Sequence, residues 1–299
     1  MVKLSSWIKA ARLRTLPLAL ASIALGGFVA APNPHFKLSV VLMAGLTTLL
    51  LQILSNFAND YGDFSKGTDD HKRIGPRRTV QSGEISASEM KVAMLITSFL
   101  ALVSGLILLF GVVQLPLIEI LVFIFLGLAA IVAAIKYTTG KNPYGYAGLG
   151  DFFVFLFFGL IGVCGTYFLA TKDWHSAVLL PATAMGMLSA GVLNLNNIRD
   201  FSNDKEKGKK TIVVKLGVEF AIGYHFLLVL LPFLFLVLYN ILEDKGIVSF
   251  LFLLLLPLFL IDLRIIRKLK NTAELDPFLR KLALKTLLLT LVYGIGFIF

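Results

Sequence analysis

The chain has 299 residues, of which 57% are hydrophobic and 15% charged, and its formal net charge is +10. Charged residues make up about a quarter of an ordinary soluble domain, so the composition excludes that class. Apolar runs of about 20 residues recur along the whole length, as bilayer-crossing helices require, and the residue alternation of a membrane β-barrel is absent. We therefore predict an all-α polytopic membrane protein. Its single cysteine, Cys164, excludes an intramolecular disulfide.

Nine apolar runs fit membrane-spanning helices. In chain order they cover residues 16–31, 38–58, 91–111, 116–136, 151–171, 177–198, 218–240, 246–264 and 282–299. The loops between them alternate between short ones, at 32–37, 112–115, 172–176 and 241–245, and long ones, at 59–90, 137–150, 199–217 and 265–281. Nearly all of the 28 basic residues lie in the N-terminal segment, in the long loops or beside them.

This distribution of Lys and Arg predicts the orientation of the chain. By the positive-inside rule, we expect the N-terminus and the long loops on the cytoplasmic side of a bacterial cytoplasmic membrane, and the C-terminus outside. The same rule accounts for the positive net charge, so we expect the lipid bilayer, and no nucleic acid, as a partner.

Two related acidic motifs follow two of the predicted spans. Asn59-Asp60-Tyr61-Gly62-Asp63 follows the second span, and Asn196-Asn197-Ile198-Arg199-Asp200 follows the sixth, four helices later. We therefore predict a single transmembrane domain over 1–299, with pseudo-repeat halves at about 1–150 and 151–280 and a ninth helix appended. Sites in repeat-built membrane proteins commonly lie between the halves, so the two motifs should face each other across a central cavity.

The spacing of the acidic residues indicates a metal site. Asn59 and Asp63 share one face of a helix that continues past residue 58, and Asp69 follows after a Gly-containing stretch where the helix has ended. In the second motif, Asn196, Asp200 and Asp204 follow at intervals of four and can form one stripe.

Carboxylate and amide oxygens on one face suit Mg²⁺, which fills its other positions with water and phosphate oxygens. The alternative is that these residues are merely solvated helix ends, but two matching triplets argue against it. Asp is also unfavourable at a helix C-terminus unless a cation is present.

Basic residues gather near the same motifs. Arg78 lies in the first long loop, Lys209 in the third, and Lys141 in the second, within a Gly- and Tyr-rich stretch that begins at Tyr137. Cations beside a metal-bound diphosphate would stabilise the departing charge. The alternative for each of them is ordinary enrichment of positive charge at the cytoplasmic surface, and for Tyr137 a role as an interfacial anchor.

These residues resemble those of the UbiA-type intramembrane aromatic prenyltransferases, most closely the branch that acts on 1,4-dihydroxy-2-naphthoate in menaquinone biosynthesis. The resemblance covers the first seven spans. It is carried by Ala11 to Pro17, Asn59 to Asp69, Pro143 to Asp151, and Asn196 to Asp204 with Lys209 to Thr211. One departure is that Gly67 stands where the superfamily often has an Asp, while Asp69 comes two residues later, a spacing typical of the naphthoate branch.

The resemblance implies a Mg²⁺-dependent transfer of a polyprenyl group from polyprenyl diphosphate to 1,4-dihydroxy-2-naphthoate, an aromatic acid, with loss of CO₂ and diphosphate and formation of demethylmenaquinol. It implies that two Mg²⁺ ions are held by four carboxylates, that two Asn support them, and that basic residues and a tyrosine contact the donor. Those positions are Asp63, Asp69, Asp200 and Asp204 for the metal, Asn59, Asn196 and Lys141 for catalysis, and Arg78, Lys141, Tyr137 and Lys209 for the diphosphate.

Other functions remain open at this point. Another arene, such as 4-hydroxybenzoate or homogentisate, would use the same metal chemistry. A secondary transporter would also show repeats, but its polar residues should lie near the middle of the membrane. A phosphotransferase of the CDP-alcohol type is disfavoured because its Asp-Gly-x-x-Ala-Arg signature is missing.

Overall fold

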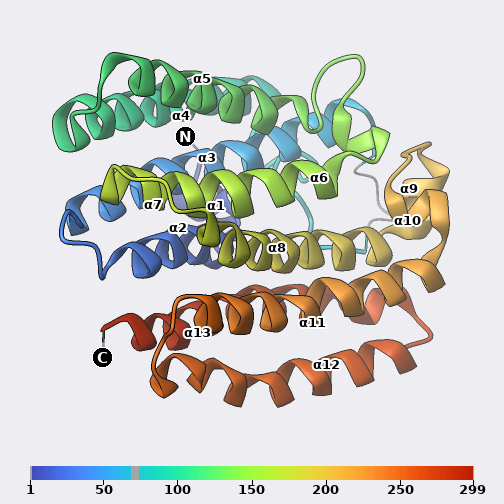
Figure 1. The fold of residues 1–299 in the computed structure, drawn as a ribbon. Helices are drawn as coiled ribbons and strands as arrows, with labels where there is room; N and C mark the ends of the chain where they lie inside the picture. Colours follow the sequence, from blue (N-terminus) through green and yellow to red (C-terminus); the bar gives the residue numbers. More distant parts are fainter. Residues whose placement is uncertain (1, 69–73, 299) are drawn as a thin grey trace.

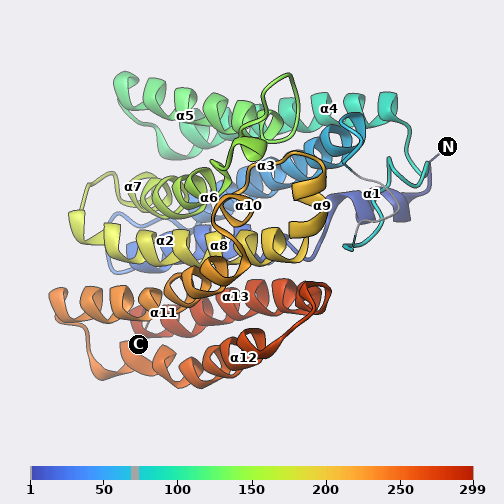
Figure 2. The same ribbon diagram turned by 90° about the vertical axis from the view of Figure 1, so that its right-hand side faces the viewer.

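The computed structural model describes residues 2–68 and 74–298, and every regular element in those ranges is a helix. The prediction of an all-α membrane protein is confirmed. The helices form three layers, which keep their order when the molecule is turned (Figures 1 and 2). One outer layer holds α4 (Ala87–Leu106) and α5 (Leu117–Lys136), and the other holds α11 (Val218–Leu242), α12 (Leu256–Lys268) and α13 (Asp276–Ile298).

The middle layer carries both acidic motifs. Its members are α2 (Leu16–Ala30), α3 (Leu38–Ser65), α6 (Gly150–Val154), η3 (Phe155–Cys164), α7 (Gly165–Thr171) and α8 (Leu179–Arg199). Shorter elements complete the described chain. They are α1 (Leu4–Ala11), η1 (Ile107–Val113), η2 (Tyr144–Ala147), η4 (Ser176–Val178), α9 (Phe201–Glu206), α10 (Ile212–Leu216), η5 (Ile247–Leu255) and η6 (Thr272–Leu275).

Eight helical segments of the described chain are long and apolar enough to cross a membrane. A ninth is obtained when α1 and α2, which meet at 56°, are taken together as one broken span. The break falls at Arg12, which adopts the left-handed conformation with φ of 51°. Helix α2 agrees with the first predicted span, residues 16–31, to within one residue, and an additional short helix precedes it.

Two other boundaries differ from the sequence prediction by more than four residues. Helix α3 continues to Ser65, beyond the end expected at residue 58, so it carries the whole first motif. Helix α13 begins at Asp276, six residues before the expected start, because Phe278 and Leu279 are buried while the neighbouring Arg280 is exposed. The fourth predicted long loop is therefore mostly helical.

Helices in the middle layer approach one another closely at glycines. A Cβ atom at Gly159 of η3 would lie 2.6 Å from the carbonyl oxygen of Ala182 in α8, and one at Gly26 of α2 would lie 2.5 Å from that of Val163. Small residues allow this close approach. In membrane proteins, helices associate through van der Waals packing and not through the hydrophobic effect. Segment η3 is π-helical over ten residues, and it forms one wall of the central cavity.

Candidate active site

A cavity of about 430 Å³ enters the bundle from the end that carries the two acidic motifs, called here the motif end. Both motifs line it, so the predicted convergence on one cavity is what the described residues show. Its lining includes Asn59 and Asp63 from the first motif, Asn196, Asp200 and Asp204 from the second, and the predicted donor-binding residues Arg78, Tyr137 and Lys209.

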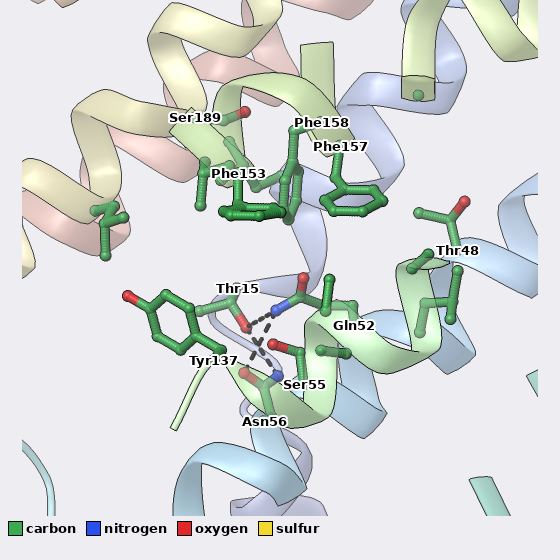
Figure 3. Close-up of a pocket in the computed structure, with 18 of the residues that line it drawn as sticks. Thr15, Thr48, Gln52, Ser55, Asn56, Tyr137, Phe153, Phe157, Phe158 and Ser189 are labelled. Atoms are coloured by element: carbon green, nitrogen blue, oxygen red, sulfur yellow. Dashed lines mark hydrogen bonds between the residues drawn. The ribbon is translucent and has the colours of Figure 1, made fainter. Parts of the chain in front are cut away.

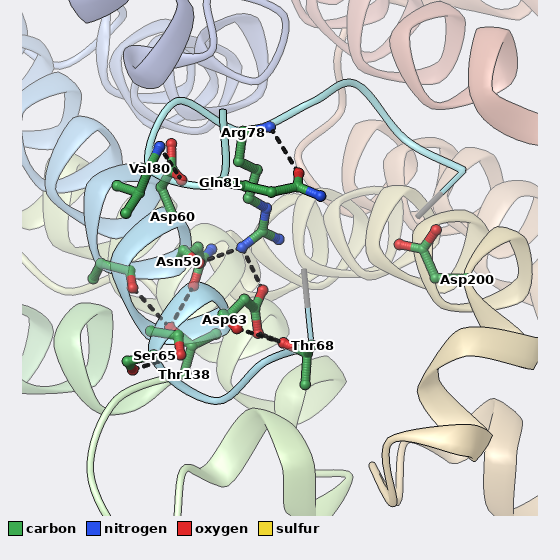
Figure 4. A network of polar contacts seen from close by, with 12 residues as sticks. Asn59, Asp60, Asp63, Ser65, Thr68, Arg78, Val80, Gln81, Thr138 and Asp200 are labelled. Atoms are coloured by element: carbon green, nitrogen blue, oxygen red, sulfur yellow. Dashed lines mark hydrogen bonds and ion pairs between the residues drawn. The ribbon is translucent and has the colours of Figure 1, made fainter. Parts of the chain in front are cut away.

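The first motif is built on the last turns of α3. Asn59 and Asp63 face the cavity, while Asp60 points away from it and is 1% exposed. The carboxylate of Asp60 accepts hydrogen bonds from the backbone N–H of Thr79 (3.1 Å), the hydroxyl of Thr79 (2.7 Å) and the N–H of Val80 (3.3 Å). Asp60 therefore holds the loop that presents the adjacent Arg78 (Figure 4).

Arg78 reaches from that loop back to the motif. Its guanidinium forms an ion pair of 2.5 Å with Asp63 Oδ2 and donates a hydrogen bond to the carbonyl oxygen of Asn59. Thr68 donates to the other oxygen of Asp63 at 3.2 Å. Asp200 lies on the opposite side of the opening from this network (Figure 4).

The loop after α5 completes the surroundings of Asp63. Tyr146 of η2 donates a hydrogen bond of 2.5 Å to Asp63 Oδ1. Burial and the neighbouring Asp63 carboxylate raise the pKa of Tyr146, which keeps its hydroxyl protonated as a donor. This loop can approach α3 because residue 62 is a glycine, since a Cβ there would collide with Thr138.

The second motif lies where α8 gives way to α9. The N–H of Asp200 donates to the carbonyl of Asn196 at 3.0 Å, and the N–H of Asp204 donates to that of Asp200 at 2.8 Å, so the helical bonding pattern continues through the junction. Asn196, Asp200 and Asp204 therefore all line the cavity, as their spacing predicted.

Arg199 holds the side chains of this second motif in place. Its side chain is fully buried, and it donates to both carboxylate oxygens of Asp200, at 2.8 and 2.7 Å, and to Asn196 Oδ1 at 2.8 Å. A further bond of 2.5 Å reaches Asp276, in the first turn of α13. A buried guanidinium requires such compensation, because an unpaired buried charge is strongly destabilising.

Lys209 joins the two motifs. Its Nζ atom lies 3.5 Å from Asp63 Oδ1 and 3.2 Å from Asp204 Oδ1, and 4.7 Å from the centre of the Tyr146 ring. Carboxylates from α3 and α9 are thus within reach of a single cation. Burial raises the pKa of Asp204 to about 6 in spite of the ammonium beside it.

The donor chemistry of this end of the cavity fits a divalent cation. Carboxylate and amide oxygens converge, and in this state Arg78, Arg199 and Lys209 neutralise them. Among residues 2–68 and 74–298, no three acidic, His or Cys side chains stand close enough to hold an ion by themselves. Water and phosphate oxygens would supply the remaining ligands, as is usual for Mg²⁺.

One described site residue, Lys141, is not brought to the cavity. Lys141 is exposed and is absent from the described cavity wall, because the chain turns outward at Gly140, whose φ is 90°. The predicted ligand Asp69 lies outside the described residues.

Deeper in the cavity, a polar side faces an aromatic side (Figure 3). The Asn56 amide donates to Thr15 Oγ1 at 3.1 Å and to the carbonyl of Ala11 at 2.8 Å, and Gln52 donates weakly to Thr15 and Asn56, at 3.5 and 3.4 Å. Phe153, Phe157 and Phe158 lie opposite. The hydroxyl of Ser189 lines the cavity with no hydrogen-bond partner in the described chain.

Sequence reasoning missed this polar side, although a signal was present. Gln52, Asn56, Asn59 and Asp63 follow one another at intervals of four, three and four residues, so they form a single stripe along α3. Tyr146 and Arg199 were also missed. Their roles depend on contacts that cross the fold, to Asp63 and Asp276, and no local pattern reveals them.

Residues 19–287 match the family model described as the UbiA prenyltransferase family. The chain belongs to the UbiA prenyltransferase family. It is 42% identical over 297 residues to a 1,4-dihydroxy-2-naphthoate octaprenyltransferase of Haemophilus influenzae, covering 98% of this chain and 96% of that protein. It is also 42% identical to the Escherichia coli protein of the same name, with 97% and 94% covered.

Solved UbiA structures have the same fold. A UbiA homolog from Archaeoglobus fulgidus bound to GPP and Mg²⁺ aligns with a TM-score of 0.70 over 98% of this chain and 99% of that one, at 16% identity. The expected membership of the UbiA family, and with it the enzyme class of a prenyltransferase, is confirmed.

Proposed function

We propose that this UbiA-family chain transfers a polyprenyl group from its diphosphate to 1,4-dihydroxy-2-naphthoate, releasing diphosphate and CO₂. The observation that carries the proposal is the convergence of Asp63 and Asp204 on Lys209 at the mouth of a cavity whose interior is largely apolar. That arrangement pairs an anion-binding, cation-rich entrance with a water-poor interior. The names of the relatives at 42% identity favour the naphthoate acceptor and an octaprenyl donor.

The charged entrance would bind the diphosphate. Mg²⁺ held by Asp63, Asp69, Asp200 and Asp204, with Asn59 and Asn196 in support, would neutralise the diphosphate oxygens as the C–O bond breaks. Arg78 and Lys209 already lie at the cavity wall beside these carboxylates, and they would transfer their hydrogen bonds to phosphate oxygens. Lys141 would approach from the surface of its loop.

Deeper in the cavity the acceptor would meet the polar and aromatic sides. Gln52, Asn56 and Ser189 offer hydrogen-bonding groups to its hydroxyl and carboxylate oxygens, and the three Phe rings pack on its ring face. The ring carbon that bears the carboxylate attacks the allylic carbon as diphosphate departs. The bond to the carboxylate then breaks, CO₂ leaves, and the released electron pair restores the aromatic ring. Phe faces can stabilise the developing allylic cation, and the apolar wall keeps water from it.

We further propose that the metal is Mg²⁺. In a bacterial cytoplasmic membrane, the motif end would be cytoplasmic and the C-terminus would lie outside. Residues 1–150 and 151–280 would be two structural repeats. The metal proposal is supported by the Mg²⁺ in the solved homolog, and the orientation by the placement of the basic residues.

An assay with the detergent-solubilised protein tests the proposal. Octaprenyl diphosphate, Mg²⁺ and 1,4-dihydroxy-2-naphthoate should yield diphosphate, CO₂ and a prenylated naphthoquinol, with 4-hydroxybenzoate and homogentisate as competing acceptors. A higher kcat/KM for either competitor would refute the naphthoate assignment. Uptake of a substrate into proteoliposomes without diphosphate release would refute the enzyme and favour a transporter.

A further inference from the structure

Helix α1, Leu4–Ala11, precedes the first long apolar helix and has no part in the proposed chemistry. Its eight residues extend about 12 Å, so it cannot cross a bilayer by itself. It meets α2 at 56° and lies at the edge of the bundle (Figure 2). Only residues 12–15 separate the two helices, so α1 lies at the level where α2 enters the membrane.

One side of α1 is packed against the bundle. Ser6 and Ala10, four residues apart on one face, are both buried. Trp7 beside them packs edge-on against Phe57 of α3, with ring centres 5.7 Å apart. These contacts fix the rotation of α1, and they decide which of its side chains face outward.

The outward side of α1 carries two further stripes, which differ in polarity. Leu4 and Ile8 form one stripe and are 75% and 47% exposed, although both side chains are large and apolar. Ser5 and Lys9 form the neighbouring stripe, which is polar and also exposed. This pattern is typical of a helix that lies in the membrane surface, with its apolar side at the boundary of the acyl chains and its polar side in water.

The charge of the N-terminal segment indicates which lipid surface it meets. Residues 1–15 contain four basic residues and no acidic one. Charged side chains are costly in the hydrocarbon core, so this segment is unsuited to that depth. An anionic headgroup layer, in contrast, attracts Lys and Arg.

We propose that α1 is an interfacial helix that binds the anionic lipid surface at the motif end. Leu4 and Ile8 insert at the boundary of the acyl chains, and the basic N-terminal segment faces the phospholipid headgroups. The apolar stripe leads on to Leu13, which is 58% exposed at the start of the chain segment that enters the membrane as α2. Two side chains bury far less area than a specific protein interface requires, so the partner is lipid and not a second copy of the chain.

Two contacts link α1 to the candidate active site. The Asn56 amide, on the polar side of the cavity, donates to the carbonyl of Ala11 at 2.8 Å. Lys9 forms an ion pair of 2.5 Å with Glu84, which follows Arg78 in the same loop. A lipid surface that holds α1 therefore also steadies the polar side of the cavity and the loop that presents Arg78. This consequence for activity rests on the proposed function.

Spin labels on α1 test its placement without any turnover. Nitroxides are attached at Leu4→Cys or Ile8→Cys, and at Ser5→Cys as the matched control, in a Cys164→Ala background. In bilayer discs of phosphatidylcholine and phosphatidylglycerol, the first two labels should collide more with oxygen, which dissolves in lipid. The label at residue 5 should collide more with a water-soluble nickel chelate.

Two results would overturn the interfacial helix. The first is equal access of the chelate to all three labels, because α1 would then lie in water. The second is shielding of all three labels from the chelate, because α1 would then lie within the membrane core. The anionic partner is tested in discs of phosphatidylcholine alone, where the label at Ile8→Cys should become more accessible to the chelate. An unchanged accessibility there would overturn the anionic lipid as the partner.

A pair of charge substitutions tests the link to the active site. Leu4→Asp and Ser5→Asp both place a carboxylate in the first turn of α1, where the helix dipole favours it, so they affect the helix alike. Leu4→Asp should expose a label at Ile8→Cys to the chelate and lower kcat/KM in discs several-fold, whereas Ser5→Asp should leave both unchanged. Equal effects of the two variants would refute the link. A wild-type protein that forms no product but shows the expected accessibilities would refute the proposed reaction and leave the interfacial helix supported.

Discussion

Asp60 and Asp63 stand three residues apart in one motif, and exchange of each for asparagine should separate a positioning role from a role in the chemistry. Asp60 is buried and accepts three hydrogen bonds from Thr79 and Val80. In Asp60→Asn, the amide oxygen can accept the two bonds from Thr79, but the amide nitrogen then faces the N–H of Val80. One hydrogen bond to a charged acceptor is lost, and the other two become hydrogen bonds to a neutral acceptor.

The magnitude follows from those bonds. A hydrogen bond to a charged group contributes about 1.5–3 kcal/mol, so the free energy of unfolding should fall by about 2–3 kcal/mol. Arg78 should lose its fixed position beside Asp63 because the loop that presents it is loosened. We therefore expect a KM for the prenyl diphosphate that is raised several-fold, with a kcat that is largely kept and an unchanged requirement for Mg²⁺.

Thermal unfolding in detergent and diphosphate release at varied donor concentration measure these effects. An unfolding temperature lowered by several degrees together with a raised KM would agree with the positioning role. Loss of all turnover at an unchanged unfolding temperature would refute it, because Asp60 would then act directly on metal or substrate.

Three further predictions concern the charged entrance. Asp63→Asn and Asp200→Asn should each lower kcat by about a hundredfold or more with the fold intact by circular dichroism, and near-normal turnover in either would contradict the metal assignment. Replacement of Mg²⁺ by Ca²⁺ should allow the donor to bind but slow product formation, because the larger ion polarises phosphate less; an undiminished rate would argue against that task for the metal. Burial raises the pKa of Asp204 to about 6, so below that pH a proton competes with the metal. The Mg²⁺ concentration for half-maximal activity should then rise by up to about tenfold per pH unit, and a constant value between pH 7 and 5 would exclude Asp204 as a ligand.

The sequence predicted the parts of the site that depend on helical spacing. Asn59 with Asp63, and Asn196 with Asp200 and Asp204, repeat at four-residue intervals, and the described structure places all five on one cavity. Helical periodicity is a local property, so it can be recognised in the sequence without knowledge of the tertiary fold.

Other parts of the site depend on long-range packing or on loop geometry, which helical spacing does not reveal. Lys141 was expected beside the diphosphate, yet the turn at Gly140 leaves it on the surface in this state. Arg199 was not singled out as a site residue, although it is fully buried. Whether a cation faces solvent or a carboxylate is decided by which helices lie beside it, and composition does not carry that information.

The bond from Arg199 to Asp276 ties the last helix, which bears no motif of its own, to the second acidic motif. Deleting that helix would remove one of the two carboxylates that compensate a guanidinium sealed from water. Truncations at the C-terminal side of the chain should therefore damage activity from a distance. In a shortened chain, the aspartates of the second acidic motif would lose their fixed positions before the remaining helices unfolded.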